Sequence, residues 1–200
     1  MKGLVVTAST GLREELRGLS RVRSVKRCAA FRPVGHDEIA VTKTSMRMLA
    51  RRIRSLEAEI NEVDKALKVL VLEVAPQLVD EFGVGPVCAA QVYVSWSHPG
   101  RCRNEASFAR LVGVAPIEAT SGQTQNRHRL NRGGDRQLNR ALHTIVSVRT
   151  RYDTDTRDCI ARSLSRKRTK SDAQRCLKRY VARRLYRPLE NPPQKALDDL

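Results

Sequence analysis

The chain has 200 residues, of which 40% are hydrophobic, 30% charged and only 4% aromatic. This length and composition predict a folded protein with a core of Leu, Val, Ile and Ala, and no apolar run approaches the length of a membrane span. Five widely spaced cysteines, with no zinc-type spacing among them, favour a reduced setting, so we expect a cytoplasmic protein that binds no metal by itself.

The positive charge of the chain is unevenly distributed. The net charge is +17, and residues 121–188 hold 19 basic and 5 acidic residues, against 18 and 13 in residues 1–120. Such a density favours a polyanionic partner, of which nucleic acid is the commonest. A generally Arg-rich proteome is the alternative, but it would not deplete acidic residues from one half.

The first predicted element is a basic helix over residues 10–30, and a turn at Pro33 comes after it. From Met46 to Val74 apolar residues then recur at alternating steps of three and four. This heptad pattern predicts one long helix of a coiled coil. Its partner is either the first helix folded back or the same helix of another subunit, and the length of the seam favours a homo-oligomer. A single long helix on its own core remains the alternative.

Residues 75–97 are predicted to form a helix-hairpin-helix. An apolar helix end is followed by Gly83-Val84-Gly85 and by Pro86, which suits the first turn of a second helix. Backbone N–H groups at the start of such a helix can hold a DNA phosphate, so Gly83 and Gly85 are candidate DNA-binding residues. A tight interhelical connection is the competing interpretation.

The rest of the chain is predicted to be helical as well. Asn104 caps a short helix, a loop spans residues 114–134, basic helices occupy 135–187, and the tail 190–200 is expected to be disordered. Helical spacing predicts that the short helix faces the core with Phe108, Leu111 and Val112. The helix that starts near Asp135 is expected to have Arg149 on its outer face and to face inward with Leu138, Leu142, Ile145 and Val146. In the last helix, Tyr180 is expected to face inward, and Arg175 and Lys178 outward. No strand is predicted. The expected fold class is therefore all-α, with a helical and coiled-coil segment at 1–74 and a small helical domain at 75–189.

The stretch ATSGQTQNRHRLNRGGDR, which begins at residue 119, concentrates the chemistry of the chain. Ser121 is either a turn residue or a nucleophile that attacks a phosphodiester, with arginines neutralising the charge on the phosphoryl group. Asp135 is expected to cap the next helix. The expected phosphate contacts are Arg127, His128, Arg129, Arg132, Arg136 and Arg140.

Several long runs carry a family resemblance, and they cover about residues 4–189. They are SFARLVGVAPIEATSG, NRHRLNRGGDRQLNRALHTIVSVR and CLKRYVARRLYRPL, with EFGVGPVCAAQ and LREELRGLS upstream. These runs closely resemble the C-terminal transposase domain and coiled coil of insertion-sequence transposases related to the Piv/MooV DNA invertases. Those bridge-RNA-guided recombinases join a RuvC-like DEDD domain, a coiled coil and a serine-bearing domain.

The resemblance implies that Ser121 forms a covalent phosphoserine link to duplex DNA, in an oligomer that also binds a guide RNA. It implies Mg²⁺ only at the carboxylate tetrad of the DEDD domain, which has no counterpart in this sequence, so we expect no cofactor in this chain. Met1 matches an internal position of the family. We therefore expect a transposase fragment that binds DNA but is inactive alone. A non-catalytic nucleic-acid-binding protein and a coiled-coil scaffold remain the alternatives.

Overall fold

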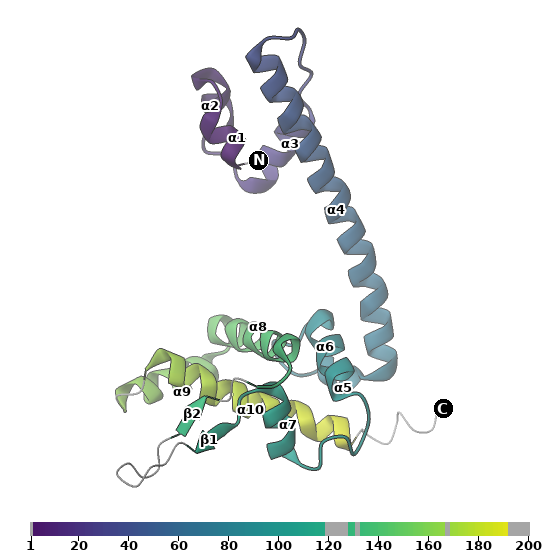
Figure 1. Ribbon diagram of the computed structural model, residues 1–200, viewed down its shortest axis with the longest axis vertical. Coiled ribbons are helices and arrows are strands. Elements are labelled where there is room, and N and C mark those ends of the chain that lie inside the picture. Colours follow the sequence, from purple (N-terminus) through teal and green to yellow (C-terminus); the bar gives the residue numbers. More distant parts are fainter. Residues whose placement is uncertain (1, 119–127, 131–132, 167–168, 192–200) are drawn as a thin grey trace. The chain divides into compact units, whose positions relative to one another are not determined.

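A computed structural model of the chain describes residues 2–118, 128–130, 133–166 and 169–191 (Figure 1). These residues are mostly helical, which confirms the predicted all-α class. The chain divides into two compact units, Met1–Lys65 and Ala66–Leu200. Each unit has its own hydrophobic core.

The first unit packs three short helices, α1 (Lys2–Thr7), α2 (Thr10–Leu16) and α3 (Arg21–Ala29), with the beginning of α4 (Glu38–Val74). The prediction of one helix over residues 10–30 was wrong. Gly18 adopts a positive φ of 71°, which ends the helical path, and Ser20 then caps α3 by accepting a hydrogen bond from the N–H of Arg23.

Helix α4 confirms the long helix that the heptad pattern predicts. Met46 is buried in the core of the first unit, but Ile60 and Val63 are 56% and 64% exposed. Most of the predicted seam beyond Ile53 is therefore open to solvent within one chain. Pairing of this seam with another helix stays a prediction.

The second unit is built around α10 (Lys170–Glu190), which packs against α5 (Pro76–Val79), α7 (Glu105–Val112), α8 (Arg136–Tyr152) and α9 (Thr154–Ser165). Helix α6 (Pro86–Trp96) packs against α8 (Figure 1). The largest fully buried side chains at the centre of this unit are Leu78, Val92, Phe108, Val112, Leu138, Leu142, Ile145, Val146, Val181 and Leu185. The inward faces predicted for α7 and α8 are thus largely confirmed.

Two short strands, which the sequence analysis missed, interrupt the helices. β1 (Pro116–Glu118) pairs antiparallel with β2 (His128–Leu130), and Glu118 lies opposite His128. Strands of three residues are too short to show an alternating pattern, so their sequence carries no strand signal. Their pairing brings the two ends of the segment 119–127 together.

Three details of the last helices differ from the prediction. Arg149, expected to point outward, is only 8% exposed, and Tyr180, expected to point inward, is 54% exposed. Helix α10 continues past Pro188 to Glu190. Burial of Leu189 and hydrogen bonds from the Trp96 indole and the Gly100 N–H to Glu190 hold this last turn in place, although proline removes one helical donor. Residues 192–200 of the predicted disordered tail lie outside the described residues.

Candidate nucleic-acid interface

The turn between α5 and α6 contains the two predicted DNA-binding glycines. Gly83 has a φ of 83°, and a Cβ at this position would lie 3.1 Å from Cγ of Arg149 and 3.3 Å from the carbonyl oxygen of Ile145. Close packing on α8 therefore explains why glycine is needed at residue 83. Gly85 is exposed, has open space around it and precedes Pro86 at the start of α6. A phosphate contact at either glycine stays a prediction.

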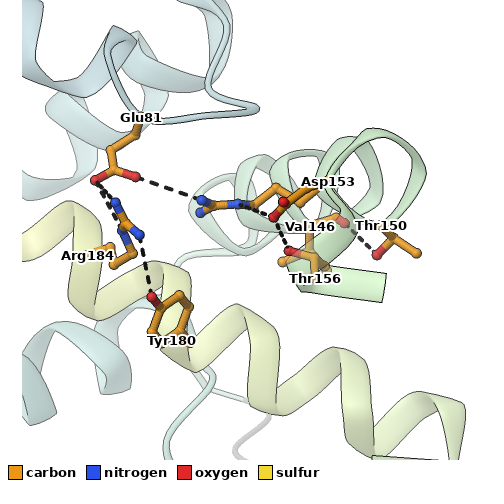
Figure 2. Close-up of polar contacts among 8 residues, drawn as sticks. Glu81, Val146, Thr150, Asp153, Thr156, Tyr180 and Arg184 are labelled. Atoms are coloured by element: carbon orange, nitrogen blue, oxygen red, sulfur yellow. Dashed lines mark hydrogen bonds and ion pairs between the residues drawn. The ribbon is translucent and has the colours of Figure 1, made fainter. Parts of the chain in front are cut away.

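An ion-pair network fixes this turn to the rest of the second unit. Figure 2 shows Glu81 beside Arg184 of α10. Nη2 of Arg184 in α10 donates to Oε1 of Glu81 across 2.9 Å, and Nη2 of Arg149 in α8 lies 4.0 Å from Oε2. Arg149 also pairs with Asp153 at 3.9 Å. Burial of Arg149 thus has a physical reason, because two carboxylates compensate its charge.

The chain leaves the C-terminal end of α7 before the segment that contains Ser121, and it returns to the same end of α7 after that segment. Gly113 ends α7 in the left-handed conformation, and the N–H of Val114 donates to the carbonyl of Ala109. On the return, the N–H of Asp135 donates to the carbonyl of Leu111 across 2.7 Å. A Cβ on Gly134, whose φ is 111°, would lie 2.6 Å from that same carbonyl oxygen, so only glycine fits there.

Asp135 confirms its predicted role as the N-cap of α8. Its Oδ1 accepts hydrogen bonds from the N–H groups of Gln137 and Leu138, and its Oδ2 accepts one from the hydroxyl of Ser95. Burial by itself would raise the pKa of Asp135, but these hydrogen bonds and the nearby charge of Arg101 outweigh it, so the pKa lies below its usual value. Asp135 is therefore held as a carboxylate.

A cavity of about 410 Å³ lies where α7, α8 and α10 meet. Its lining includes Val114 and Gly133, close to the two ends of the serine-bearing segment. We call it the basic cavity, because the described residues of its lining include four basic side chains: Arg136, His143, Arg175 and Lys178. Asp135 is the one acidic residue among these described lining residues. The structure thus brings basic residues from two helices together beside the predicted serine loop.

The predicted site residues differ in how the structure describes them. Arg136 and Arg140 are exposed one turn apart on α8. The backbones of His128 and Arg129 lie in β2. The remaining predicted residues, Ser121, Arg127 and Arg132, lie outside the described residues.

Sequence reasoning missed three residues of the basic cavity: His143, Arg175 and Lys178. Arg175 and Lys178 were expected only to be on the outer face of their helix. Lys178 is half-buried instead, and its Nζ donates to Oδ1 of Asn139 across 2.9 Å. That partner lies 39 residues away in the chain. The helical pattern of α10 contains no signal for such a contact.

The described residues do not fit a metal site. Among them, no group of three or more His, Cys, Asp and Glu side chains could hold a metal ion. We therefore derive no step through the Mg²⁺ that the family resemblance implies. Within the same residues, no helix is both long and apolar enough to cross a membrane.

Comparison with known proteins finds one family. Residues 77–161 match the model of the IS116/IS110/IS902 family of transposases. The matched segment contains the turn between α5 and α6, the position of Ser121 and the α8 residues of the basic cavity. None of the curated proteins compared with the chain matches it. The family match supports a function in transposition.

Proposed function

We propose that this protein binds duplex DNA and acts in DNA strand transfer, with Ser121 as the nucleophile. The observation that carries the proposal is the match of residues 77–161 to the transposase family, because this segment includes residue 121 and the basic helix α8. The excess of basic residues after residue 120 supports DNA as the partner. We further propose a cytoplasmic location, a guide RNA as a second partner, and oligomerisation through α4.

In the proposed reaction, Oγ of Ser121 attacks the phosphorus of a DNA phosphodiester. A bond forms between phosphorus and Oγ, the bond to the leaving sugar oxygen breaks, and the serine proton ends on that leaving oxygen. Positive side chains around the site stabilise the negative charge that develops on the phosphoryl oxygens. Arg136 and the other basic residues of the cavity are the described side chains that we propose for this role.

The test is a covalent-adduct assay on the full chain with labelled duplex and nicked DNA. Because the family resemblance places the metal-binding carboxylates in a DEDD domain, the assay includes Mg²⁺ and such a domain added in trans. We expect a denaturant-resistant protein–DNA adduct with the wild-type chain and none with Ser121→Ala. The control is Ser147→Ala, which removes an exposed hydroxyl from α8 and should leave the adduct unchanged.

A non-catalytic DNA-binding protein is the second candidate, and the basic cavity favours it as much as it favours the transposase. This candidate predicts no adduct under any condition, and equal DNA affinity for the wild-type chain and Ser121→Ala. Absence of adduct even with the DEDD domain and Mg²⁺ present would reject Ser121 as the nucleophile. A Ser121-dependent adduct would reject the non-catalytic candidate.

A further inference from the structure

The charge of the basic cavity is only partly compensated by protein groups. Arg175 pairs with Asp172 at 2.7 Å. Asp135, the acidic residue in the lining, accepts its side-chain hydrogen bonds from Ser95 and from backbone N–H groups at the start of α8. Among the described residues, no ion pair involves Arg136 or Lys178. The cavity therefore has a surplus of positive charge.

Lys178 occupies a special position within this cavity. Its ammonium group donates to Oδ1 of Asn139, and Nδ2 of Asn139 donates to the carbonyl of Val112 across 2.8 Å. This chain of hydrogen bonds fixes Lys178 of α10 against α8 and the end of α7. An ammonium group has three N–H donors, so Lys178 can donate to further acceptors in the cavity.

Burial makes the charge of Lys178 costly. Burial lowers the pKa of Lys178 below its ordinary value, because the ammonium group is partly desolvated. An anion in the cavity would offset this cost, since charge-assisted hydrogen bonds are the stronger ones. Arg136, His143 and Arg175 also line the cavity and add N–H hydrogen-bond donors to those of Lys178. Several donors in one cavity suit a compact anion.

We propose that the basic cavity binds one phosphodiester group of a DNA strand, with Lys178 as its central ligand. The inference rests on the proposed function, because it takes the polyanion to be DNA. Val114 and Gly133 line the cavity. A phosphate bound here would lie close to where the chain enters and leaves the segment that contains Ser121. The site thus anchors the DNA backbone without reading its sequence.

The experiment measures duplex affinity of the full chain by fluorescence anisotropy over a range of salt concentrations. Lys178→Gln removes the charge from the cavity and keeps a side chain of similar length. The matched control Lys68→Gln makes the same change at an exposed position on α4. We expect Lys178→Gln to weaken binding by about tenfold. It should also lower the slope of log K against log salt by about 1, whereas Lys68→Gln should change neither by as much.

A double variant guards against unfolding of the Lys178 variant. Arg136→Gln with His143→Gln changes two exposed residues of the same cavity and is expected to weaken duplex binding with the same loss of salt slope. Thermal unfolding shows which variants are folded. The cavity assignment is wrong if folded Lys178→Gln and the double variant both bind DNA as the Lys68 control does.

Two further outcomes separate this inference from the proposed function. Absence of salt-dependent duplex binding by the wild-type chain would reject the proposed function, and DNA as the cavity's ligand with it. Normal binding by the wild-type chain and unchanged binding by the cavity variants would reject the cavity alone. A parallel titration with a structured RNA tests whether the ligand is DNA or RNA. If the cavity variants lose affinity for RNA alone, the cavity is not a DNA site.

Discussion

The hydroxyl of Ser95 in α6 donates a hydrogen bond to Oδ2 of Asp135 across 2.5 Å, which joins α6 to the N-cap of α8. Arg101 adds to this contact by donating from Nη1 to the carbonyl of Ser95. The side chain of Asp135 therefore both begins α8 and fixes the chain where it returns from the serine-bearing segment. Its geometry links the fold of the second unit to the candidate site.

Ser95→Ala is expected to lower the free energy of unfolding by about 1 kcal/mol, because a partly buried carboxylate loses one of its three side-chain hydrogen bonds. The pKa of Asp135 should rise in this variant. Denaturant unfolding and an NMR titration of Asp135 measure the two effects. The control is Ser147→Ala, because the Ser147 hydroxyl donates to the carbonyl of His143 within α8. In this variant the free energy of unfolding and the pKa of Asp135 should both stay close to wild type. An unchanged pKa of Asp135 in Ser95→Ala would contradict the role given to this bond.

Asp135→Asn keeps a capping side chain but removes the charge. Because folding lowers the pKa of Asp135 below 3.8, the carboxylate stabilises the folded chain above pH 3.8, and this contribution is lost as the pH falls through the folded pKa. The variant should therefore be less stable than wild type at pH 6, and the difference should shrink below pH 3.8. Asp158→Asn on the exposed surface of α9 is the control. A difference independent of pH would contradict the prediction.

Glu81→Gln should be clearly destabilising. It removes the charge that lies between Arg149, which is buried, and Arg184. Removal of one partner of a largely buried ion pair costs about 3 kcal/mol. Glu105→Gln is the control, since Glu105 pairs with the more exposed Arg183 and Arg187, and we expect a loss of about 0.5 kcal/mol. Equal losses in urea unfolding would show that the Glu81 network does not hold the turn.

Gly83→Ala tests the packing of the turn between α5 and α6. Its Cβ would meet α8 at 3.1 Å and the backbone would be forced to keep a positive φ, so we expect a loss of about 2 kcal/mol in stability. Gly85→Ala has open space around its Cβ and a negative φ, so it should unfold like wild type. Thermal denaturation followed by circular dichroism distinguishes the two. If both variants are equally stable, close packing is not the reason for Gly83.

Ile60→Glu tests whether α4 pairs with a second copy of the chain. Ile60 is 56% exposed within one chain, and in a coiled coil it would occupy the seam, where a charge is costly. We expect the variant to dissociate at concentrations at which wild type is oligomeric, as sedimentation velocity measures. Ala58→Glu introduces the same charge on the opposite side of the helix and should leave the oligomer intact. A monomeric wild-type chain would contradict the prediction.

The sequence was enough to predict several local features: the long helix α4, the helix caps at Asn104 and Asp135, and the inward faces of α7 and α8. Each depends on residues within a few turns of one another, where helical spacing and capping chemistry decide the outcome. The charge excess after residue 120 and the family runs likewise pointed to transposition without a structure. In contrast, the sequence has too little local signal to predict the helix break at Gly18 or the two short strands.

Only the tertiary structure decided the roles that depend on distant partners. Arg149 is buried because the turn after α5 brings Glu81 close to it, and Lys178 is half-buried because Asn139 on another helix accepts its hydrogen bond. Helical periodicity assigns a side chain to a face but does not say which charges lie opposite that face. The sequence by itself therefore determined a basic helical protein with a candidate serine, and folding determined which basic residues share one cavity.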